Sequence, residues 1–252
     1  MAGRNAVKTV AKSTKKSTKT GGAKAGIART SGPRGKRAEL AAERVAEILR
    51  LLHEQYGDAR CALDHNSAWE LLVATILSAQ CTDVRVNMVT PKLFATYPTP
   101  EAMAAAPIEA LETLIRTTGF YHNKAKSIQG AGRVIDQHFG GRVPQTMDEL
   151  LRVPGAARKT ANVVLGVAFG KAEGVVVDTH VFRITRRLGL ARGETPQKVE
   201  QELMQVIPRE RWIGFSHELI HHGRAVCEAR KPKCSQCMLE PLCTAKDKTW
   251  RS

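Results

Sequence analysis

The stretch RVPGAARKTANVVL, residues 152–165, decides how the rest of the chain is interpreted. A short helix is expected to end before Pro154 and Gly155, and a new helix to begin at about Lys159. Backbone N–H groups at such a junction are unpaired and point outward, so they can hold a phosphate. Any tight turn between two helices has a similar sequence, so the stretch on its own fits a plain connection equally well.

Helical patterns dominate the chain on both sides of this turn. Residues 37–57 repeat apolar residues at three- and four-residue steps and end in a glycine. Residues 67–80 open with Ser67 and Glu70 in capping-box spacing and are apolar nearly all round, which predicts a buried helix. Only GVVVD at 174–178 has the pattern of a strand, so the predicted fold class is all-α. Further helices are expected over residues 99–119, 123–141, 146–153, 159–170, 178–190, 195–208 and 211–223.

The positive charge of the chain is concentrated at its N-terminus. The 252 residues carry a formal net charge of +15, and residues 1–37 hold eleven Lys or Arg and no Asp or Glu. This segment lacks the apolar residues that could offset its ordering entropy, so we expect a disordered basic tail. Such a polycation would raise the affinity for phosphate backbones, although an organelle transit peptide has a similar composition.

The sequence does not indicate export or membrane insertion. Met1 is followed by lysines and threonines without the apolar core of a signal peptide. No run of about 18 uncharged apolar residues is present. We therefore expect a monomeric cytoplasmic protein associated with the nucleoid.

The cysteines point to a metal site. Without a secretion signal, crowded cysteines favour metal binding over disulfides. A zinc ribbon usually pairs two C-x2-C knuckles, whereas here a single C-x2-C is flanked by two longer arms. Four of the six cysteines lie within seventeen residues, namely Cys227, Cys234, Cys237 and Cys243.

A second metal motif precedes these cysteines. HELIHHG, residues 217–223, contains His-Glu-x-x-His, the spacing that places two imidazoles around a catalytic zinc. A zinc protease needs a third protein ligand, and the acidic candidate at a suitable distance, Glu240, lies inside the cysteine loop. Trp212, Phe215 and Leu219 give the helix an apolar face, so we expect a packing helix rather than a protease site.

Several motifs together resemble the endonuclease III family of DNA repair glycosylases. Residues 152–165 are similar to its helix–hairpin–helix, whose usual pattern is Leu-Pro-Gly-Val-Gly-Arg-Lys-Thr-Ala. The likeness continues through LSAQCTD at 77–83, TTGFYHNKA at 117–125, VDTHVFR at 177–183 and the terminal cysteines. It therefore covers most of the chain from about residue 38 to residue 245.

The resemblance implies a two-lobed fold. One lobe is a six-helix domain over residues 61–171 that contains the helix–hairpin–helix at about 147–170. The other is an iron–sulfur cluster domain over residues 172–252, against which an N-terminal helix over residues 38–60 packs. Nucleophile and carboxylate would then face each other across a cleft between the lobes.

The implied activity is that of a bifunctional DNA glycosylase and AP lyase acting on double-stranded DNA with damaged pyrimidines or abasic sites. The family's nucleophile corresponds to Lys159, and its catalytic carboxylate to Asp178. A lysine attacks only as the neutral amine, which the helix N-terminus, neighbouring Arg158 and partial desolvation would favour. From the residues alone, Lys159 is a surface lysine in a first helical turn and Asp178 an ordinary N-cap.

Other positions correspond to the family's DNA contacts. Gln80 would fill the hole left by a flipped nucleotide, and Phe120, where the family usually has an aliphatic residue, would wedge beside it. Without the resemblance, Gln80 is an ordinary helix C-terminus and Phe120 an ordinary core residue. The remaining candidates for phosphate contact are Gly155, Ala157 and Arg158 in the hairpin and Arg230, Lys231 and Lys233 between the first two cysteines.

The hairpin departs from the family pattern at Ala156 and Ala157, where Val-Gly is usual. The second of these is normally a glycine that is free to adopt positive φ. Alanine in the left-handed conformation costs about 1–2 kcal/mol. We therefore expect a hairpin that grips the DNA backbone less well or adopts another turn.

The cysteine spacing C-x6-C-x2-C-x5-C over residues 227–243 resembles the loop that ligates a [4Fe–4S] cluster in this family, with zinc as a minor alternative. Two other functions stay open at this point. One is that of the related glycosylases that remove adenine opposite oxidised guanine, which typically lack the hairpin lysine. The other is that of a damaged-DNA-binding protein with weakened catalysis, which the alanine in the hairpin would favour.

Overall fold

The computed structural model describes residues 33–249, and this part of the chain contains helices and no β-strand. The all-α prediction is confirmed, while the strand-like residues 174–178 form no strand: Gly174 lies in a bend and residues 175–178 have no regular secondary structure. The α-helices are α1 (Pro33–Tyr56), α2 (Ala68–Leu77), α3 (Asp83–Thr96), α4 (Pro100–Ala105), α5 (Ile108–Ile115), α6 (Tyr121–Phe139), α7 (Met147–Leu150), α8 (Arg158–Phe169), α9 (Thr179–Arg187), α10 (Pro196–Val206) and α11 (Trp212–Ala225). The short 3-10 helices are η1 (Arg116–Thr118), η2 (Arg209–Arg211), η3 (Cys234–Gln236) and η4 (Glu240–Leu242).

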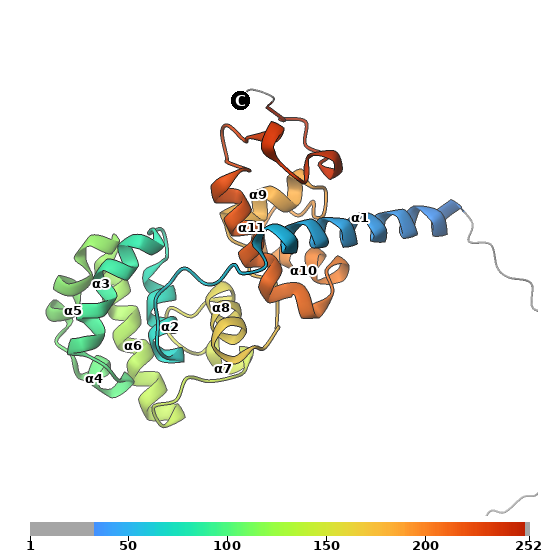
Figure 1. The fold of residues 1–252 in the computed structure, drawn as a ribbon. Helices are drawn as coiled ribbons and strands as arrows, with labels where there is room; N and C mark the ends of the chain where they lie inside the picture. The colour runs from blue at the N-terminus through green and yellow to red at the C-terminus, as the bar shows by residue number, and fades with distance from the viewer. Residues whose placement is uncertain (1–32, 250–252) are drawn as a thin grey trace, which may run out of the picture.

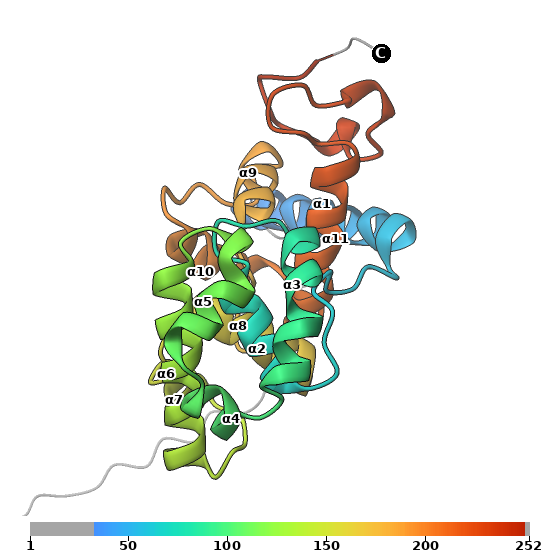
Figure 2. The ribbon, with the colours of Figure 1, turned by 90° about the vertical axis from the view of Figure 1, so that its left-hand side faces the viewer.

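The helices form two groups, as Figure 1 shows, and each group encloses its own hydrophobic core. Helices α2 to α8 enclose the first core and form what we call the hairpin lobe. Helices α1 and α9 to α11 enclose the second core and, with residues 226–249, form the cysteine lobe. The chain passes between the lobes twice, after α1 and after α8, so α1 lies with the C-terminal helices in both views (Figures 1 and 2).

Helix α2 forms the centre of the hairpin lobe. Its residues are apolar nearly all round, and Trp69 and every residue from Leu71 to Leu77 are buried. The Ser67 side chain caps the helix by accepting a hydrogen bond from the backbone N–H of Glu70 at 3.1 Å. The predicted buried helix is thus confirmed.

Helix α3 is an element that the sequence patterns do not predict. It contains Pro91, which usually interrupts a helix, and its apolar residues do not form one stripe, since Val84 and Met88 are 72% and 65% exposed. Its start could have been found from Thr82, whose side chain accepts a hydrogen bond from the backbone N–H of Arg85.

Helix α1 begins at Pro33, inside the segment expected to be a tail, because proline suits the first position of a helix. The rest of the predicted tail, residues 1–32, lies outside the described residues. The helix is anchored by Ile48, Leu49 and Leu52 in the core of the cysteine lobe. Along residues 33–249, no helix is long and apolar enough to cross a bilayer.

Close packing of α4 on α6 depends on a glycine. At Gly132, an added Cβ would lie 2.6 Å from the carbonyl oxygen of Pro100 and 3.1 Å from the backbone nitrogen of Ala104. We predict that Gly132→Ala lowers the free energy of unfolding by about 1–3 kcal/mol, because α4 must move away. Thermal unfolding measures the effect.

Gly214→Ala is the matched control, because an added Cβ at this helical glycine would meet nothing closer than the Glu218 carboxylate at 3.6 Å. This control should leave the melting temperature unchanged or raise it, since alanine is the better helix former by about 0.5–1 kcal/mol. Equal melting temperatures for the two variants would contradict the prediction.

Candidate active site and metal centre

The predicted hairpin lies between α7 and α8. The Thr146 side chain caps α7 by accepting from the backbone N–H of Glu149, and Leu150 and Val153 anchor the turn in the core. The backbone N–H of Ala156 donates to the carbonyl of Val153 at 3.0 Å. The two helices are thus joined by a short turn with a buried inner side.

The N-terminus of α8 has no side-chain cap. Its N-cap residue is Ala157, which has no hydroxyl or carboxylate, whereas Ser, Thr or Asp side chains cap α2, α3, α4, α7, α9 and α10. The first backbone N–H groups of an uncapped helix have no partner within the helix and carry its partial positive charge. The first turn of α8 is therefore suited to an anion.

The prediction that the backbone is strained at Ala157 is wrong. Ala157 has φ −69° and ψ 167°, an extended conformation that any residue adopts. The positive φ lies at Gly155, with φ +80°. The chain reverses at this glycine and is already extended when it enters α8, as is usual for an N-cap residue. Alanine therefore replaces glycine here without a conformational cost.

Lys159 is the second residue of α8 and its side chain is exposed. The protein alone thus does not supply the partial desolvation that the sequence led us to expect. Neighbouring Arg158 is also not free, because its Nε donates to both carboxylate oxygens of Glu200, at 3.0 and 3.1 Å. Its charge is thereby paired in the absence of DNA.

Asp178 is the N-cap of α9. Its Oδ1 accepts a hydrogen bond from the backbone N–H of Val181 at 2.8 Å, and its side chain is half-buried. Burial lowers the pKa of the nearby His180, and the Asp178 carboxylate acts in the opposite direction. The capping role expected from the sequence is confirmed, and the catalytic role stays a prediction.

Glu200 is a residue that the sequence patterns did not single out. The residue is 6% exposed, and its carboxylate accepts hydrogen bonds from Arg158 and from Asn162 Nδ2, the latter at 2.8 Å. These partners lie on α8, whereas Glu200 lies on α10. No local pattern could have found this contact, because it joins residues about forty positions apart.

Gln80 and Phe120 share an uncommon backbone conformation. Among residues 33–249 they are the only non-glycine residues with positive φ, at 53° and 49°. Phe120 is 65% exposed, so the alternative that it is a core residue is wrong. Gln80 is also exposed and lies beyond the end of α2. Non-glycine residues in this conformation are enriched at ligand contacts.

A buried lysine lies beneath the Phe120 turn. Lys124 is 5% exposed, and its Nζ donates to the carbonyl oxygen of Thr118 at 2.7 Å. Burial lowers the pKa of Lys124, and nearby Cys81, which follows Gln80, acts in the opposite direction. Lys124 therefore contacts one of the two exposed turns and lies close to the other.

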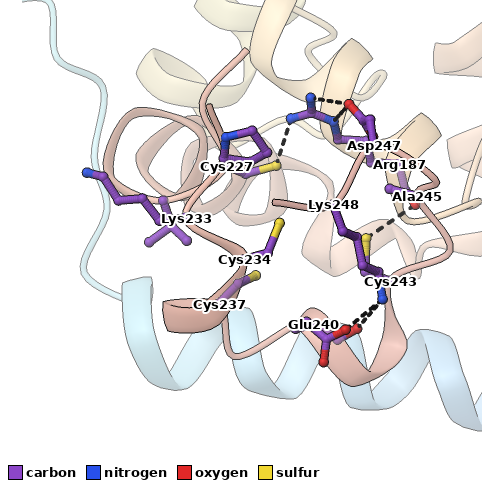
Figure 3. A pocket seen from close by; sticks show the side chains of 12 residues that line it. Arg187, Cys227, Lys233, Cys234, Cys237, Glu240, Cys243, Ala245, Asp247 and Lys248 are labelled. Atoms are coloured by element: carbon purple, nitrogen blue, oxygen red, sulfur yellow. Dashed lines mark hydrogen bonds and ion pairs between the residues drawn. The ribbon is translucent and has the colours of Figure 1, made fainter. Parts of the chain in front are cut away.

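The four crowded cysteines come together at the end of the cysteine lobe. All are half-buried and line one pocket, and Figure 3 shows their sulfur atoms turned toward a common space. Burial raises the pKa of Cys237 to about 11, so this group becomes a thiolate only when a cation favours it. No set of three or more His, Cys, Asp or Glu side chains within residues 33–249 is arranged to hold a single metal ion.

Three of these sulfur atoms each have a nitrogen atom within 3.5 Å. N–H groups that point at cysteine sulfurs are a usual feature of metal–thiolate sites. They polarise the sulfur and orient the side chain. The pairs are Arg187 Nη1 with Cys227 at 3.4 Å, Thr249 N with Cys234 at 3.4 Å, and His222 Nε2 with Cys237 at 3.5 Å.

The basic arm between the first two cysteines is only partly free. Arg230 and Lys231 are exposed. Lys233 is instead bonded within the lobe, because its Nζ donates to the carbonyl of Ala225 at 3.0 Å and pairs with Glu228 at 3.1 Å. Of the three basic residues, Arg230 and Lys231 are the better placed for a phosphate.

The His-Glu-x-x-His stretch lies in α11 and packs as expected. Glu218 is 2% exposed and accepts from Arg211 Nη2 with both carboxylate oxygens at 2.9 Å, while His53 lies 3.0 Å away. A carboxylate paired in this way holds the lobe together. Burial also lowers the pKa of His217. The prediction of a packing helix is confirmed.

The two-lobed helical fold with its helix–hairpin–helix matches a known class of DNA repair proteins. Residues 73–209, more than half of the chain, match the HhH-GPD superfamily of base excision DNA repair proteins. The endonuclease III of Synechocystis sp. is 55% identical over 201 residues, covering 80% of this chain and 92% of that protein. The endonuclease III of Escherichia coli is 43% identical over 202 residues, covering 80% and 95%.

Solved structures agree with this grouping. A non-covalent endonuclease III–DNA complex matches with a TM-score of 0.77 at 43% identity, and a trapped endonuclease III–DNA covalent intermediate with a TM-score of 0.77 at 44% identity. Each match covers 81% of this chain and 95% of the solved chain. The chain belongs to the endonuclease III family and is a bifunctional DNA glycosylase and AP lyase.

The hairpin geometry predicts different outcomes for substitutions at Gly155 and Ala157. Gly155→Ala should weaken DNA binding and lower the melting temperature, because φ +80° costs alanine about 1–2 kcal/mol. The added Cβ would also lie 3.0 Å from Ser127 Cβ and 3.2 Å from Ile76. Fluorescence anisotropy with a duplex that carries an uncleavable abasic analogue measures the affinity.

Ala157→Gly should bring no gain in DNA affinity, because Ala157 already has an extended backbone. A clear gain in affinity for Ala157→Gly would show that the hairpin is strained at Ala157 after all.

Proposed function

We propose that the protein removes oxidised pyrimidines of the thymine glycol type from double-stranded DNA, with Lys159 as the nucleophile and Asp178 as the assisting carboxylate. One observation carries the proposal: Lys159 is exposed on the uncapped first turn of α8, within a helix–hairpin–helix. A covalent DNA intermediate has been trapped for a relative that is 44% identical.

The proposed reaction begins with the damaged nucleotide flipped out of the stack. Lys159 Nζ then forms a bond to C1′ while the bond to the base breaks. The departing base takes the bonding electrons and is protonated by solvent. The Asp178 carboxylate stabilises the positive charge that develops at C1′ and accepts the proton that the amine loses. Transfer of that proton to the ring oxygen opens the sugar and gives a Schiff base between Lys159 and C1′. Loss of a 2′-proton and of the C3′–O bond then cuts the strand 3′ to the lesion.

DNA binding would use backbone and side-chain groups together. The first-turn N–H groups of α8, next to Gly155 and Ala157, would hold a phosphate. Gln80 and Phe120 would enter the duplex, because both are exposed and are already held in the left-handed conformation. Arg230 would add a phosphate contact, as would Lys231. Arg158 and Lys233 would serve chiefly in contacts within the protein, since both are engaged there.

The cysteine site fits a [4Fe–4S] cluster, which is held by four cysteine thiolates. The four half-buried thiols line one pocket, and their sulfur atoms turn toward a common space (Figure 3). A single C-x2-C between two longer arms also differs from the paired knuckles of a zinc ribbon. When bound, the cluster would cross-link the loop through its iron–sulfur bonds. Residues 227–243 would then present Arg230 and Lys231 with little loss of conformational freedom.

Neither alternative function is favoured by the site. The hairpin lysine, which adenine glycosylases of this superfamily typically lack, is present and exposed as Lys159. The idea of weakened catalysis rested on Ala157, whose backbone is unstrained. We therefore propose an enzyme that acts on damaged pyrimidines and at abasic sites.

Chemical trapping tests the nucleophile. Borohydride reduces a Schiff base to a stable amine, so we predict a covalent adduct with duplexes that carry thymine glycol or an abasic site. Lys159→Gln should abolish the adduct, whereas Lys92→Gln, at another exposed lysine of the hairpin lobe, should keep it. Asp178→Asn should slow adduct formation by about 100-fold or more. An adduct that persists in Lys159→Gln would exclude Lys159 as the nucleophile.

Metal analysis tests the cysteine site. We predict absorbance at about 400 nm and about four iron atoms with matching sulfide per chain, as a [4Fe–4S] cluster requires. Cys237→Ala should lose the iron and expose residues 227–243 to proteolysis. Cys61→Ala, at a half-buried cysteine of the hairpin lobe, should retain the iron. Zinc in place of iron after anaerobic purification would overturn the assignment.

A further inference from the structure

The buried Glu200 carboxylate joins the two lobes at the N-terminal end of α8, the helix that carries Lys159. It lies on α10 of the cysteine lobe, and its hydrogen-bond donors lie on α8 of the hairpin lobe. Arg158 Nε donates to Oε1 at 3.1 Å and to Oε2 at 3.0 Å. Asn162 Nδ2 donates to Oε1 at 2.8 Å. One acidic side chain thus holds two positions of the same helix.

These two positions flank Lys159. Residues four apart in an α-helix lie on one face, so Arg158 and Asn162 face Glu200 together. Two bonds to one face fix the rotation of the first turn of α8 about its axis. Lys159 follows Arg158 directly, so the direction in which its side chain leaves the helix is fixed as well.

The same carboxylate lies against the segment that leads to Asp178. A Cβ added at Gly174 would lie 2.1 Å from Glu200 Oε1 and 2.7 Å from Asn162 Nδ2. The chain therefore passes directly over this contact before Asp178 begins α9, and Val175 and Val177 are buried on the way. Glu200 thus contacts the helix of the amine and closely approaches the segment of the carboxylate.

A further detail concerns Asn162. Its Oδ1 is buried and has no hydrogen-bond partner among residues 33–249. Within the described residues, the amide is held by the bond that Nδ2 donates to Glu200. Loss of Glu200 would leave the amide without a partner, and buried amides then rotate or draw in water.

We propose that Glu200 is a positioning residue for the reaction: it sets the orientation of Lys159 relative to Asp178. The proposal rests on the roles proposed above for these two residues. Glu200 itself does not touch DNA in this arrangement, because it is buried beneath α8. A second ion pair between the lobes, Arg224 with Asp83 at 2.5 Å, joins α11 to α3 without contacting α8 and serves as the comparison.

The test compares chemistry with binding in four variants. Glu200→Ala and Gly174→Ala should each slow single-turnover borohydride trapping at an abasic site by roughly tenfold to hundredfold, as expected for a misplaced nucleophile. Affinity for an uncleavable abasic analogue should stay near that of the wild type. Gly174→Ala removes no hydrogen-bonding group and perturbs the contact by its volume alone.

Glu200→Gln is the conservative variant. The glutamine carbonyl can accept from Arg158 while its amide donates to Asn162 Oδ1, so most of the wild-type rate should return. Asp83→Asn removes the comparison ion pair and should leave the trapping rate unchanged. A merely stabilising role for Glu200 predicts instead that rates follow melting temperatures in all four variants.

Wild-type trapping rates in Glu200→Ala and Gly174→Ala would overturn the inference, as would a rate loss of the same size in Asp83→Asn. Should Glu200→Ala fail to fold, Gly174→Ala and Glu200→Gln decide between the two roles. Failure of the wild-type protein to form an adduct would instead reject the proposed nucleophile.

Discussion

The buried contact of Glu200 with Arg158 and Asn162 joins two lobes that have separate cores. In the proposed mechanism, this contact would hold the amine of one lobe and the carboxylate of the other in a fixed relation. A buried carboxylate is costly unless it is paired and hydrogen-bonded, so its partners are strongly constrained. Gly174 is constrained in the same way, because no side chain fits between it and this contact. Lys159 on one lobe and Asp178 on the other could therefore act together in a single site.

The backbone rather than side chains prepares the hairpin for DNA. Six of the α-helices within residues 33–249 are capped by a Ser, Thr or Asp side chain, whereas the helix that begins at Arg158 has no such cap. An unfilled helix N-terminus is a general anion site, whatever side chain lies at the N-cap. Ala157 can replace the usual glycine because its backbone is extended, while Gly155 has the positive φ. In the proposed mode of binding, the N–H groups of the first turn would contact the phosphate, so the side chain at the N-cap matters little.

Local rules predicted much of the fold. Capping residues such as Ser67 and Thr146 begin helices where expected, and the cysteines of residues 227–243 meet in one pocket. The failures have a common physical cause. The backbone angle at Ala157 depends on how Gly155 turns the chain, and the partners of Glu200 lie on a helix distant in sequence. Contacts of this kind arise only when the lobes pack together, so no pattern along the chain contains them.

Gln80 and Phe120 keep a left-handed backbone in the free protein, which costs roughly 1–3 kcal/mol at each position. Buried Lys124 holds the Thr118 carbonyl next to one of them and lies close to the other. Part of the folding stability thus maintains this backbone conformation in the free protein. In the proposed mode of binding, the two residues would meet a duplex already in place, and the conformational change during a search along DNA would fall on the DNA.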